Sequence, residues 1–346
     1  MSEINYFTPE TAGFKNRSPM LLVVGILFIV AGAISGCLGM FVPLALLVPR
    51  PASMPQQSVA HVVFALALYI GLAAAAITLG IGAVRKRRWA PPLILAGSWI
   101  GLIMGLFGLV TWAFRAPQFI AGMKQSMSAG RTGAPAPPPG MINFILGVTA
   151  LFMFVLYLVV PGVLIWLFRD ENVRQTVAFY DPKPRWTDRM PLLPLIFFLV
   201  TIQAIFFPLM MISQSWWPVF GAVLYGPAAI AAAIATALLF AIAAWQILKL
   251  RLIGWWMAVV LWTAYMLSAI VTMCSADMRQ VYERAGMDAR QLQMMRDTHM
   301  LPDGWWAVAS GAFLIAFIAL ALYARRYFNA SAGAEVPPPI PQSPSA

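Results

Sequence analysis

Ionisable residues are scarce in this sequence, and none lies in the interior of its apolar segments. Charged residues make up 10% of the 346 residues, whereas globular proteins contain about a quarter. All 23 basic and 12 acidic residues fall at segment ends, in loops or in tails. Ion-coupled transport and intramembrane catalysis depend on buried ionisable groups, so we expect neither proton nor sodium coupling.

Cysteine and histidine are almost absent, with two of each. Cys37 lies near the middle of the first apolar segment and Cys274 at the outer end of the seventh, a depth difference of roughly 10 Å at ~1.5 Å per helical residue. A disulfide needs Cα atoms within about 7 Å, so we predict two free thiols. Ser35 lacks a histidine at its own depth, because His61 begins the second segment, and this argues against an intramembrane serine protease.

Sequence motifs for metal, redox and nucleotide chemistry are also missing. The sequence contains no H-E-x-x-H, no C-x-x-C and no P-loop. We therefore predict that the protein is not an enzyme, has no catalytic residues and carries no cofactor.

What the sequence has in abundance is long apolar runs, which supply most of its 61% hydrophobic content. About 20 residues of helix cross ~30 Å of hydrocarbon, and every run is long enough. None shows the alternation of a barrel strand. The sequence predicts an all-α transmembrane bundle of eight helices. They are expected at about 20–48, 58–84, 89–114, 141–168, 191–213, 219–248, 252–274 and 304–324.

The distribution of positive charge predicts the orientation of the bundle. With the N-terminus inside, 15 of the 23 basic residues fall on the inner side and eight on the outer side, as the positive-inside rule requires. Ten of the 13 tryptophans fall at predicted span ends, where head groups lie. We expect a multi-pass protein of a bacterial inner membrane, with both termini cytoplasmic.

The spans divide the chain into two halves joined by a polar connector. The second half includes a long outer loop at 275–303, and the chain ends in a proline-rich tail that we expect to be disordered. The predicted parts are a cytoplasmic N-terminal segment (1–19), a first four-helix half (20–168), a cytoplasmic connector (169–190), a second four-helix half (191–324) and the tail (325–346).

The two halves resemble each other. Residues 40–44 read MFVPL and residues 205–209 read IFFPL, at an offset of 165. Trp99 and Trp262 lie at the centres of the third span of each half. Four spans per half give both halves the same topology, so the pattern predicts a parallel 4+4 repeat about an axis along the membrane normal.

Polar residues at the middle of the spans are few: Gln203 and Thr201 in the fifth, Thr236 in the sixth and Thr263 in the seventh. An unpaired amide in hydrocarbon costs several kcal/mol, so Gln203 is expected to face a partner helix or a wet cavity. These four residues are the candidate binding site for a small solute. The alternative is an interhelical hydrogen bond worth ~0.6 kcal/mol.

Two further features favour contacts with helices and lipids. Gly97, Gly101 and Gly105 form a strip at four-residue spacing, which permits close helix packing. Arg85, Lys86, Arg87 and Arg88 form a polybasic turn that we expect to contact anionic lipid head groups at the inner face, at about 1 kcal/mol per charge. Nothing in this turn specifies nucleic acid.

The last outer loop contains a methionine-rich set, namely Met294, Met295, His299 and Met300. Thioether and imidazole ligands suit copper. The simpler interpretation is an amphipathic surface helix in a methionine-rich protein, and we favour it over a metal site.

The inner connector 169–190 mixes five basic and four acidic residues with Trp186 and two prolines. This density of mixed charge is typical either of a structured cap with a docking surface or of an ordinary solvated connector. Both it and the loop 275–303 are candidate surfaces for a protein partner.

The stretch Asp181–Asp188 (DPKPRWTD), followed by Pro191-Leu192, resembles a connector found in bacterial polytopic membrane proteins, and the closing Arg325–Phe328 (RRYF) resembles them too. The resemblance implies a bacterial inner-membrane setting and carries no activity with it. The sequence thus predicts a non-catalytic membrane component, such as a scaffold, a sensor or a partner of a complex. The alternative is a permease or channel for a small neutral or apolar solute without ion coupling.

Overall fold

The computed structural model describes residues 13–44, 59–128, 139–287, 289–297 and 304–330. Within these residues, eight helices are long and apolar enough to cross a membrane, which confirms the predicted helical bundle. The candidate spans are Ser18–Phe41, Val62–Val84, Ala90–Pro117, Phe144–Phe168, Leu192–Gln214, Gly226–Leu248, Leu252–Ser275 and Trp306–Phe328.

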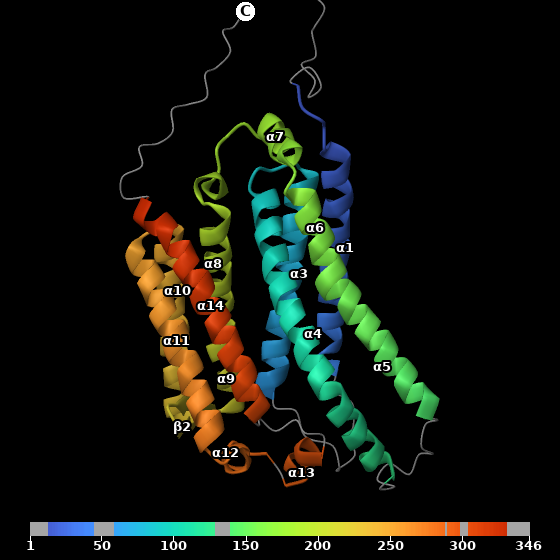
Figure 1. The fold of residues 1–346 in the computed structure, drawn as a ribbon, viewed down its shortest axis with the longest axis vertical. Helices are drawn as coiled ribbons and strands as arrows, with labels where there is room; N and C mark the ends of the chain where they lie inside the picture. The colour runs from blue at the N-terminus through green and yellow to red at the C-terminus, as the bar shows by residue number, and fades with distance from the viewer. Residues whose placement is uncertain (1–12, 45–58, 129–138, 288, 298–303, 331–346) are drawn as a thin grey trace, which may run out of the picture.

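Two groups of long helices stand side by side, with their axes running roughly along the long axis of the molecule (Figure 1). The first half contains α1 (Ser18–Phe41), α3 (Val59–Val84), α4 (Ala90–Ser128) and a fourth span made of α5 (Pro139–Phe154), the π-helical turn η1 (Val155–Val159) and α6 (Val160–Phe168). The second half contains α8 (Leu192–Gln203), α9 (Phe206–Gln214), α10 (Gly226–Leu248), α11 (Leu252–Ser275) and α14 (Gly304–Ala330). The start of α1 and the end of α14 lie at the same end of the bundle, which we call the inner end.

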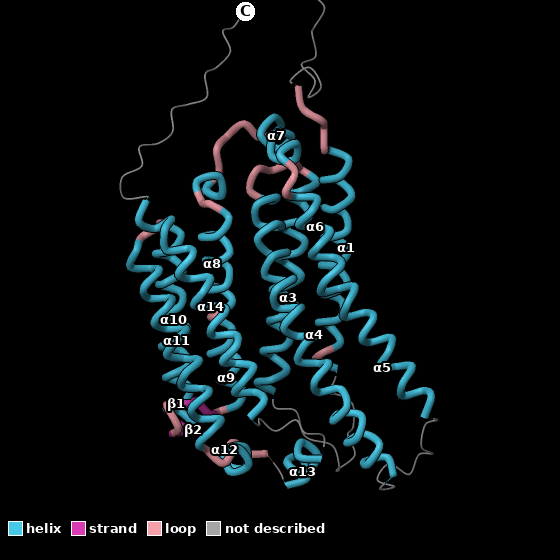
Figure 2. Tube along the Cα trace, viewed as in Figure 1, coloured by secondary structure: helices cyan, strands magenta, loops and turns pink. Residues whose placement is uncertain are grey.

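Short elements cover both ends of the bundle (Figure 2). At the inner end lie α7 (Glu171–Tyr180) and the single turn η2 (Trp186–Arg189). At the opposite, outer end lie the strands β1 (Trp216–Val219) and β2 (Ala222–Tyr225) and the helices α12 (Met278–Arg284) and α13 (Ala289–Asp297).

The outward faces of the spans are as apolar as their inward faces. Leu27, Leu151 and Ile315 have 61%, 63% and 71% of their surface exposed. In water such exposure would oppose folding, but hydrocarbon solvates these side chains. Backbone groups must instead be paired inside each segment, which only helices achieve for isolated spans.

Glycines bring α1 and α3 into close contact. A Cβ placed on Gly32 would lie 2.9 Å from the carbonyl oxygen of Ala73, and one on Gly80 would lie 2.6 Å from that of Gly25. The glycines of α1 that face α3 most closely, Gly25, Gly32 and Gly39, are seven residues apart. A seven-residue period keeps one stripe of a helix facing its partner when the two helices wind in a left-handed supercoil.

Aromatic side chains fill the core of the second half. Trp262 is 1% exposed, and its ring lies 5.4 Å from that of Phe317 and 5.7 Å from that of Phe240. The indole N–H of Trp255 donates to the carbonyl of Ala321 at 2.8 Å and so joins α11 to α14. Tryptophans at span ends are therefore not all lipid-facing: Trp216, Trp217 and Trp255 are buried.

A β-hairpin replaces the predicted start of the sixth span. The sequence analysis placed a helix at 219–248, but the helix begins at Gly226, and β1 and β2 pair in antiparallel register from Trp216↔Tyr225 to Val219↔Ala222. Phe220 and Gly221 have φ of 43° and 93°, as a two-residue hairpin turn of the right twist requires.

Proline lies at a departure from regular α-helix in two spans. Pro208 has no N–H to donate to the carbonyl of Ala204, and the fifth span breaks there into α8 and α9. Pro161 follows the π-helical turn η1 in the fourth span. Pro43 lies beyond the end of α1 at Phe41, so the two prolines of the matched stretches occupy different local structures. The parallel repeat stays a prediction.

Candidate functional site

An ordered cap covers the inner end of the first half. Helix α7 begins at Asp170, whose carboxylate accepts the N–H of Asn172 at 3.0 Å. Val173 and Val177 are buried and belong to one apolar cluster with residues of α1, α3, α4 and α6. The carboxylate of Asp170 caps the start of α7. The apolar face of this amphipathic helix packs against the inner ends of the helices.

The N-terminal segment is bound to this helix. The backbone N–H groups of Lys15 and Arg17 donate to the side-chain oxygens of Asn172 (3.0 Å) and Thr176 (3.1 Å). The guanidinium of Arg17 also pairs with Asp170, with its Nε 2.8 Å from the carboxylate. Residues more than 150 positions apart therefore form one surface.

The polybasic turn between α3 and α4 is bound to the cap as well. Arg88 lies 3.2 Å from Asp188 by its Nε and donates its backbone N–H to Asp181. Arg87 lies 3.9 Å from Asp181, and the ammonium of Lys86 lies 3.6 Å from the ring centre of Tyr180. Three of the four cations that we expected to contact lipid head groups thus have partners within the chain, and Arg85 is exposed.

Asp181 is the central acid of the cap. Its side chain is only 4% exposed, and it pairs with Arg185 at 3.1 Å. Hydrogen bonds from Arg185 lower the pKa of Asp181, with further help from the Arg88 N–H. The pKa of Asp170 is lowered chiefly by the backbone and side-chain donors of Asn172, and then by Arg17. Both groups are thereby held as carboxylates at neutral pH.

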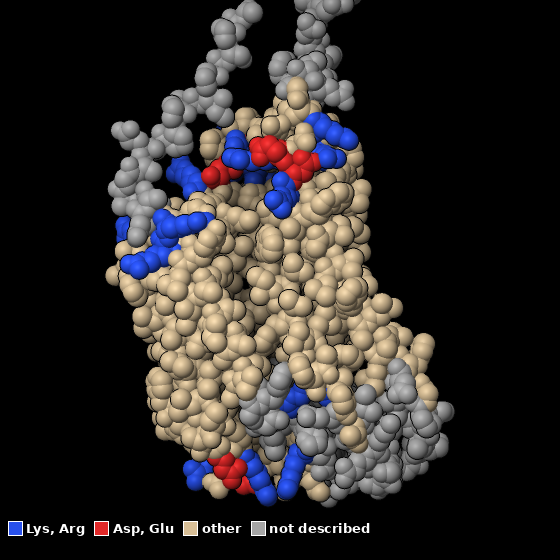
Figure 3. All heavy atoms as spheres, viewed as in Figure 1, with Lys and Arg blue, Asp and Glu red and all other residues tan. Residues whose placement is uncertain are grey.

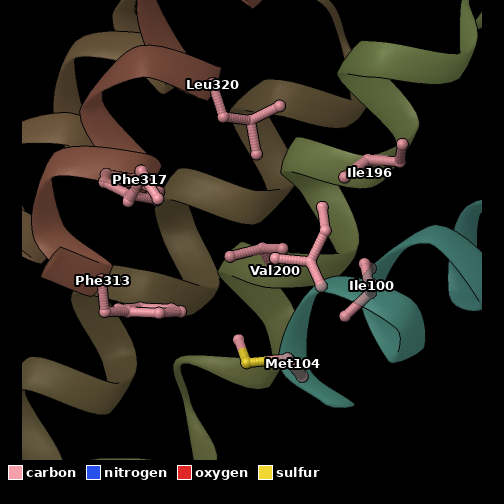
Figure 4. Close-up of a pocket in the computed structure, with 9 residues that line it drawn as sticks. Ile100, Met104, Ile196, Val200, Phe313, Phe317 and Leu320 are labelled. Atoms are coloured by element: carbon pink, nitrogen blue, oxygen red, sulfur yellow. The ribbon is translucent and has the colours of Figure 1, made fainter. Parts of the chain in front are cut away.

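An apolar recess of about 110 Å³ lies between the two halves. Figure 4 shows its lining side chains converging from α4, α8 and α14. All nine are apolar, and they are Ile100, Ile103, Met104, Ile196, Val200, Phe313, Ala316, Phe317 and Leu320. Phe107 and Phe313, with ring centres 6.0 Å apart, also join α4 to α14.

The four polar residues predicted as a solute site do not line this recess. Thr201 is fully buried and donates to the carbonyl of Phe197, and Thr236 donates to that of Ala232, both at 2.8 Å. Thr263 is half-buried on α11. They lie on three different helices, and each bonded threonine uses its own backbone as acceptor.

Gln203 differs from these threonines because its side chain is exposed, at the last residue of α8. It follows Val200 by three residues and Ile196 by seven, so the three share one stripe of the helix. Ile196 and Val200 line the recess. Gln203 thus lies one helical turn beyond Val200, on the same face of α8 that lines the recess.

The glycine strip of α4 faces the fourth span. A Cβ on Gly105 would lie 2.5 Å from the Cβ of Tyr157, and one on Gly101 would lie 3.7 Å from Pro161, whereas one on Gly97 would have no neighbour within 4 Å. The close approach falls where η1 widens the helix, so two of the three glycines lie at a helix contact.

The outer loop forms two short helices. Met278 and Val281 of α12 pack with Trp216 of the hairpin, whose ring lies 6.0 Å from that of Tyr282; burial raises the pKa of this phenol. Met294 and Met295 lie on α13, and His299 and Met300 lie outside the described residues. Among the residues that the structure describes, no three His, Cys, Asp or Glu side chains are grouped to hold a metal ion.

Sequence reasoning missed the pairing of the polybasic turn with the connector. The signal was present as four cations at 85–88 and carboxylates at 181 and 188, but charge of opposite sign does not by itself reveal which loops meet.

In comparisons with known proteins, no family model, no curated protein and no solved structure matches this chain.

Proposed function

We propose that this polytopic membrane protein is a non-catalytic component that binds a protein partner through its inner cap. The cap is the connector 169–190, which includes helix α7. The observation that carries the proposal is the network that orders this segment. The N-terminal segment holds its start through Asp170 and Thr176, and the turn 85–88 holds its end through Asp181 and Asp188.

The outward side of the cap has the properties of a docking surface. Glu171, Arg174 and Gln175 are exposed on α7, opposite its buried valines. Tyr180 and Trp186 are 42% and 47% exposed, and aromatic residues of this kind dominate many interfaces. A surface that is already ordered loses less conformational entropy when it binds. The mixed charge of the segment adds selectivity between partners.

The proposed setting is a bacterial inner membrane with both termini cytoplasmic, which puts the cap in the cytoplasm. The support is the excess of basic residues on that side of the chain. The loop 275–303 is the second candidate docking surface, at the opposite face.

The test is purification of the full chain after mild solubilisation. A protein partner is expected in stoichiometric amount, and it should be lost from an Arg174→Glu, Gln175→Lys variant. Arg279→Glu at the outer end is the matched control and should retain it. Equal recovery with both variants would reject the cap as the docking surface, and loss with Arg279→Glu alone would assign docking to the outer loop.

A second candidate is passage or binding of a small apolar solute, favoured by the recess between the halves. Its lining is entirely apolar, as for a ligand held by dispersion and hydrophobic contact. Val200→Trp should fill the recess and abolish flux of such a solute into liposomes, and Gln203→Leu tests the polar residue beside it. Unchanged flux in both variants would reject this function.

A further inference from the structure

The inner end of the second half carries its own group of basic side chains. Lys249 and Arg251 belong to the turn between α10 and α11, and Arg325 and Arg326 to the end of α14. We call these four residues the second-half basic patch. Figure 3 shows Lys and Arg side chains gathered over this end of α14, while the Asp and Glu side chains of the inner end lie over the cap.

The acidic residues of the cap are already paired with cations of the cap itself, of the N-terminal segment or of the turn 85–88. Asp170 pairs with Arg17, Glu171 with Arg174, Asp181 with Arg185, and Asp188 with Arg88. No ion pair among the described residues includes any member of the second-half basic patch. The patch therefore presents uncompensated positive charge, unlike most of the polybasic turn.

Aromatic rings lie against three of these four cations, and Arg251 instead donates to the side chain of Gln246 at 3.3 Å. The guanidinium carbon of Arg325 lies 5.5 Å from the ring centres of both Trp255 and Trp256. That of Arg326 lies 3.9 Å from the ring centre of Tyr323, and the ammonium of Lys249 lies 4.6 Å from that of Trp245. One Nη of Arg326 donates to the hydroxyl of Tyr327 at 3.1 Å. A guanidinium over a ring can still offer its other in-plane N–H groups to phosphate oxygens.

The two parts of the patch, the turn between α10 and α11 and the end of α14, are held by hydrogen bonds. The hydrogen bond from Trp255 to Ala321 fixes α11 against α14 one turn from Arg325. The turn that carries Lys249 and Arg251 is closed by N–H groups of both residues donating to the carbonyl of Gln246, at 3.2 and 3.1 Å. The exposed Trp245 and Trp256 belong at the head-group level of a bilayer.

We propose that the second-half basic patch binds the phosphate head group of an anionic phospholipid in the leaflet at the inner end of the bundle. Uncompensated charge, ring-supported guanidinium groups and flanking tryptophans match the charge and depth of that head group. The proposal places the specific lipid contact on the second half, whereas the cations at 86–88 mainly order the cap. It does not depend on the partner proposed for the cap.

The test measures how strongly the reconstituted full chain prefers spin-labelled phosphatidylglycerol over spin-labelled phosphatidylcholine at its surface. The patch variant carries Lys249→Gln, Arg251→Gln, Arg325→Gln and Arg326→Gln. The control removes the same charge from exposed cations at the same face, with Arg85→Gln, Arg169→Gln, Arg174→Gln and Lys183→Gln. Both are compared after they elute from size exclusion as the wild type does.

In the patch variant the preference for phosphatidylglycerol over phosphatidylcholine should fall at least about fivefold, which is the expected effect of a single interfacial charge. In the control variant it should stay within about twofold of the wild-type value. An equal loss in both variants would show that only the total charge of the face matters. An unchanged preference in the patch variant would show that the patch does not bind the lipid. Either result overturns the proposal. A variant that keeps the charge, Arg251→Lys with Arg325→Lys and Arg326→Lys, should keep part of the preference, because an ammonium retains the charge but not the planar set of donors. A loss equal to that of the patch variant would contradict a charge-based site.

Inorganic phosphate, compared with chloride at equal ionic strength, separates a lipid head group from the free anion. Phosphate should leave the lipid preference unchanged. A decrease specific to phosphate would assign the patch to the free anion and overturn the proposal.

Discussion

At the scale of single residues, Asp181 matters most for the inner cap. It is the one buried carboxylate in the described residues, and it contacts cations of both the connector and the turn before α4. We predict that Asp181→Asn weakens the cap by about 2 kcal/mol, as expected for hydrogen bonds to a charged group. Limited trypsin digestion should then cleave faster after Arg185, which is followed by Trp186.

Glu171→Gln is the control for that substitution. Glu171 is 64% exposed and lies 3.9 Å from Arg174, and exposed pairs of this kind contribute little. It should leave the digestion rate unchanged. Equal sensitivity of the two variants would mean that Asp181 does not hold the connector.

The cap should also respond to acid. The folded-state pKa values of Asp170 and Asp181 are lowered, so their stabilising effect is complete above the ordinary aspartate pKa of about 4. It is lost as the pH falls through the lower folded values. A fluorophore on Arg174→Cys, in a chain without Cys37 and Cys274, should keep constant anisotropy from about pH 8 to 5 and become mobile below about 4. A midpoint near neutrality would contradict this assignment.

Gly105 shows how one missing side chain positions two spans. Gly105→Val would place atoms inside the contact with Tyr157 and should cost about 1–3 kcal/mol, the usual penalty of overpacking. Gly97→Val on the same helix meets open space and is the control. Thermal unfolding in detergent should show a lowered Tm for the first variant alone.

At the scale of elements, the β-hairpin is the part that sequence reasoning missed. Trp216–Tyr225 is almost wholly apolar, so composition alone joined it to the helix that follows. Phe220-Gly221 is not the Asn-Gly or Asp-Gly pair that signals a hairpin. What makes it a hairpin is tertiary: the Ser268 hydroxyl accepts the N–H of Phe220 at 3.0 Å and donates to the carbonyl of Pro218 at 2.8 Å, and Thr272 accepts the N–H of Gly221 at 3.0 Å.

Ser268→Ala should therefore loosen the hairpin tip. Losing this hydroxyl leaves backbone groups unpaired in an apolar setting, which costs about 1–3 kcal/mol. Hydrogen–deuterium exchange should accelerate at the amides of Phe220 and Gly221. Thr236→Ala removes a hydroxyl that bonds only its own helix and should leave that exchange unchanged, and equally fast exchange in both variants would refute the role of Ser268.

The spans themselves were predictable because the bilayer sets their length and their apolar surface needs no partner. The sequence did not predict which faces of the spans pack against one another. The sequence analysis identified a glycine strip in the third span, whereas the closest contacts between α1 and α3 follow the seven-residue series from Gly25. Low amphipathicity leaves a helix without a face marked for burial, so close approach is decided by details of both partners.

At the scale of the whole molecule, eight spans imply that both ends of the chain share one side. The same count places three spans between residues 174 and 279, which should therefore lie on opposite sides. Single cysteines at Arg174 and Arg279, whose side chains are 81% and 61% exposed, test this in a chain without Cys37 and Cys274. A membrane-impermeant maleimide added to spheroplasts should label Arg279→Cys and spare Arg174→Cys until the membrane is opened. The reverse pattern would invert the orientation, and labelling of both would contradict the count of spans.

The cap also has a consequence for biosynthesis. The cations at 85–88 leave the ribosome some 93 residues before Asp181, their nearest acidic partner in the chain. While α1, α3 and α4 enter the bilayer, the connector carboxylates that pair with these cations in the finished protein have not been made. We therefore expect the full charge of the turn to help retain it on the side of synthesis. Translation of the connector then neutralises part of that charge, so we expect three of these residues, Lys86, Arg87 and Arg88, first to direct insertion and afterwards to hold the cap.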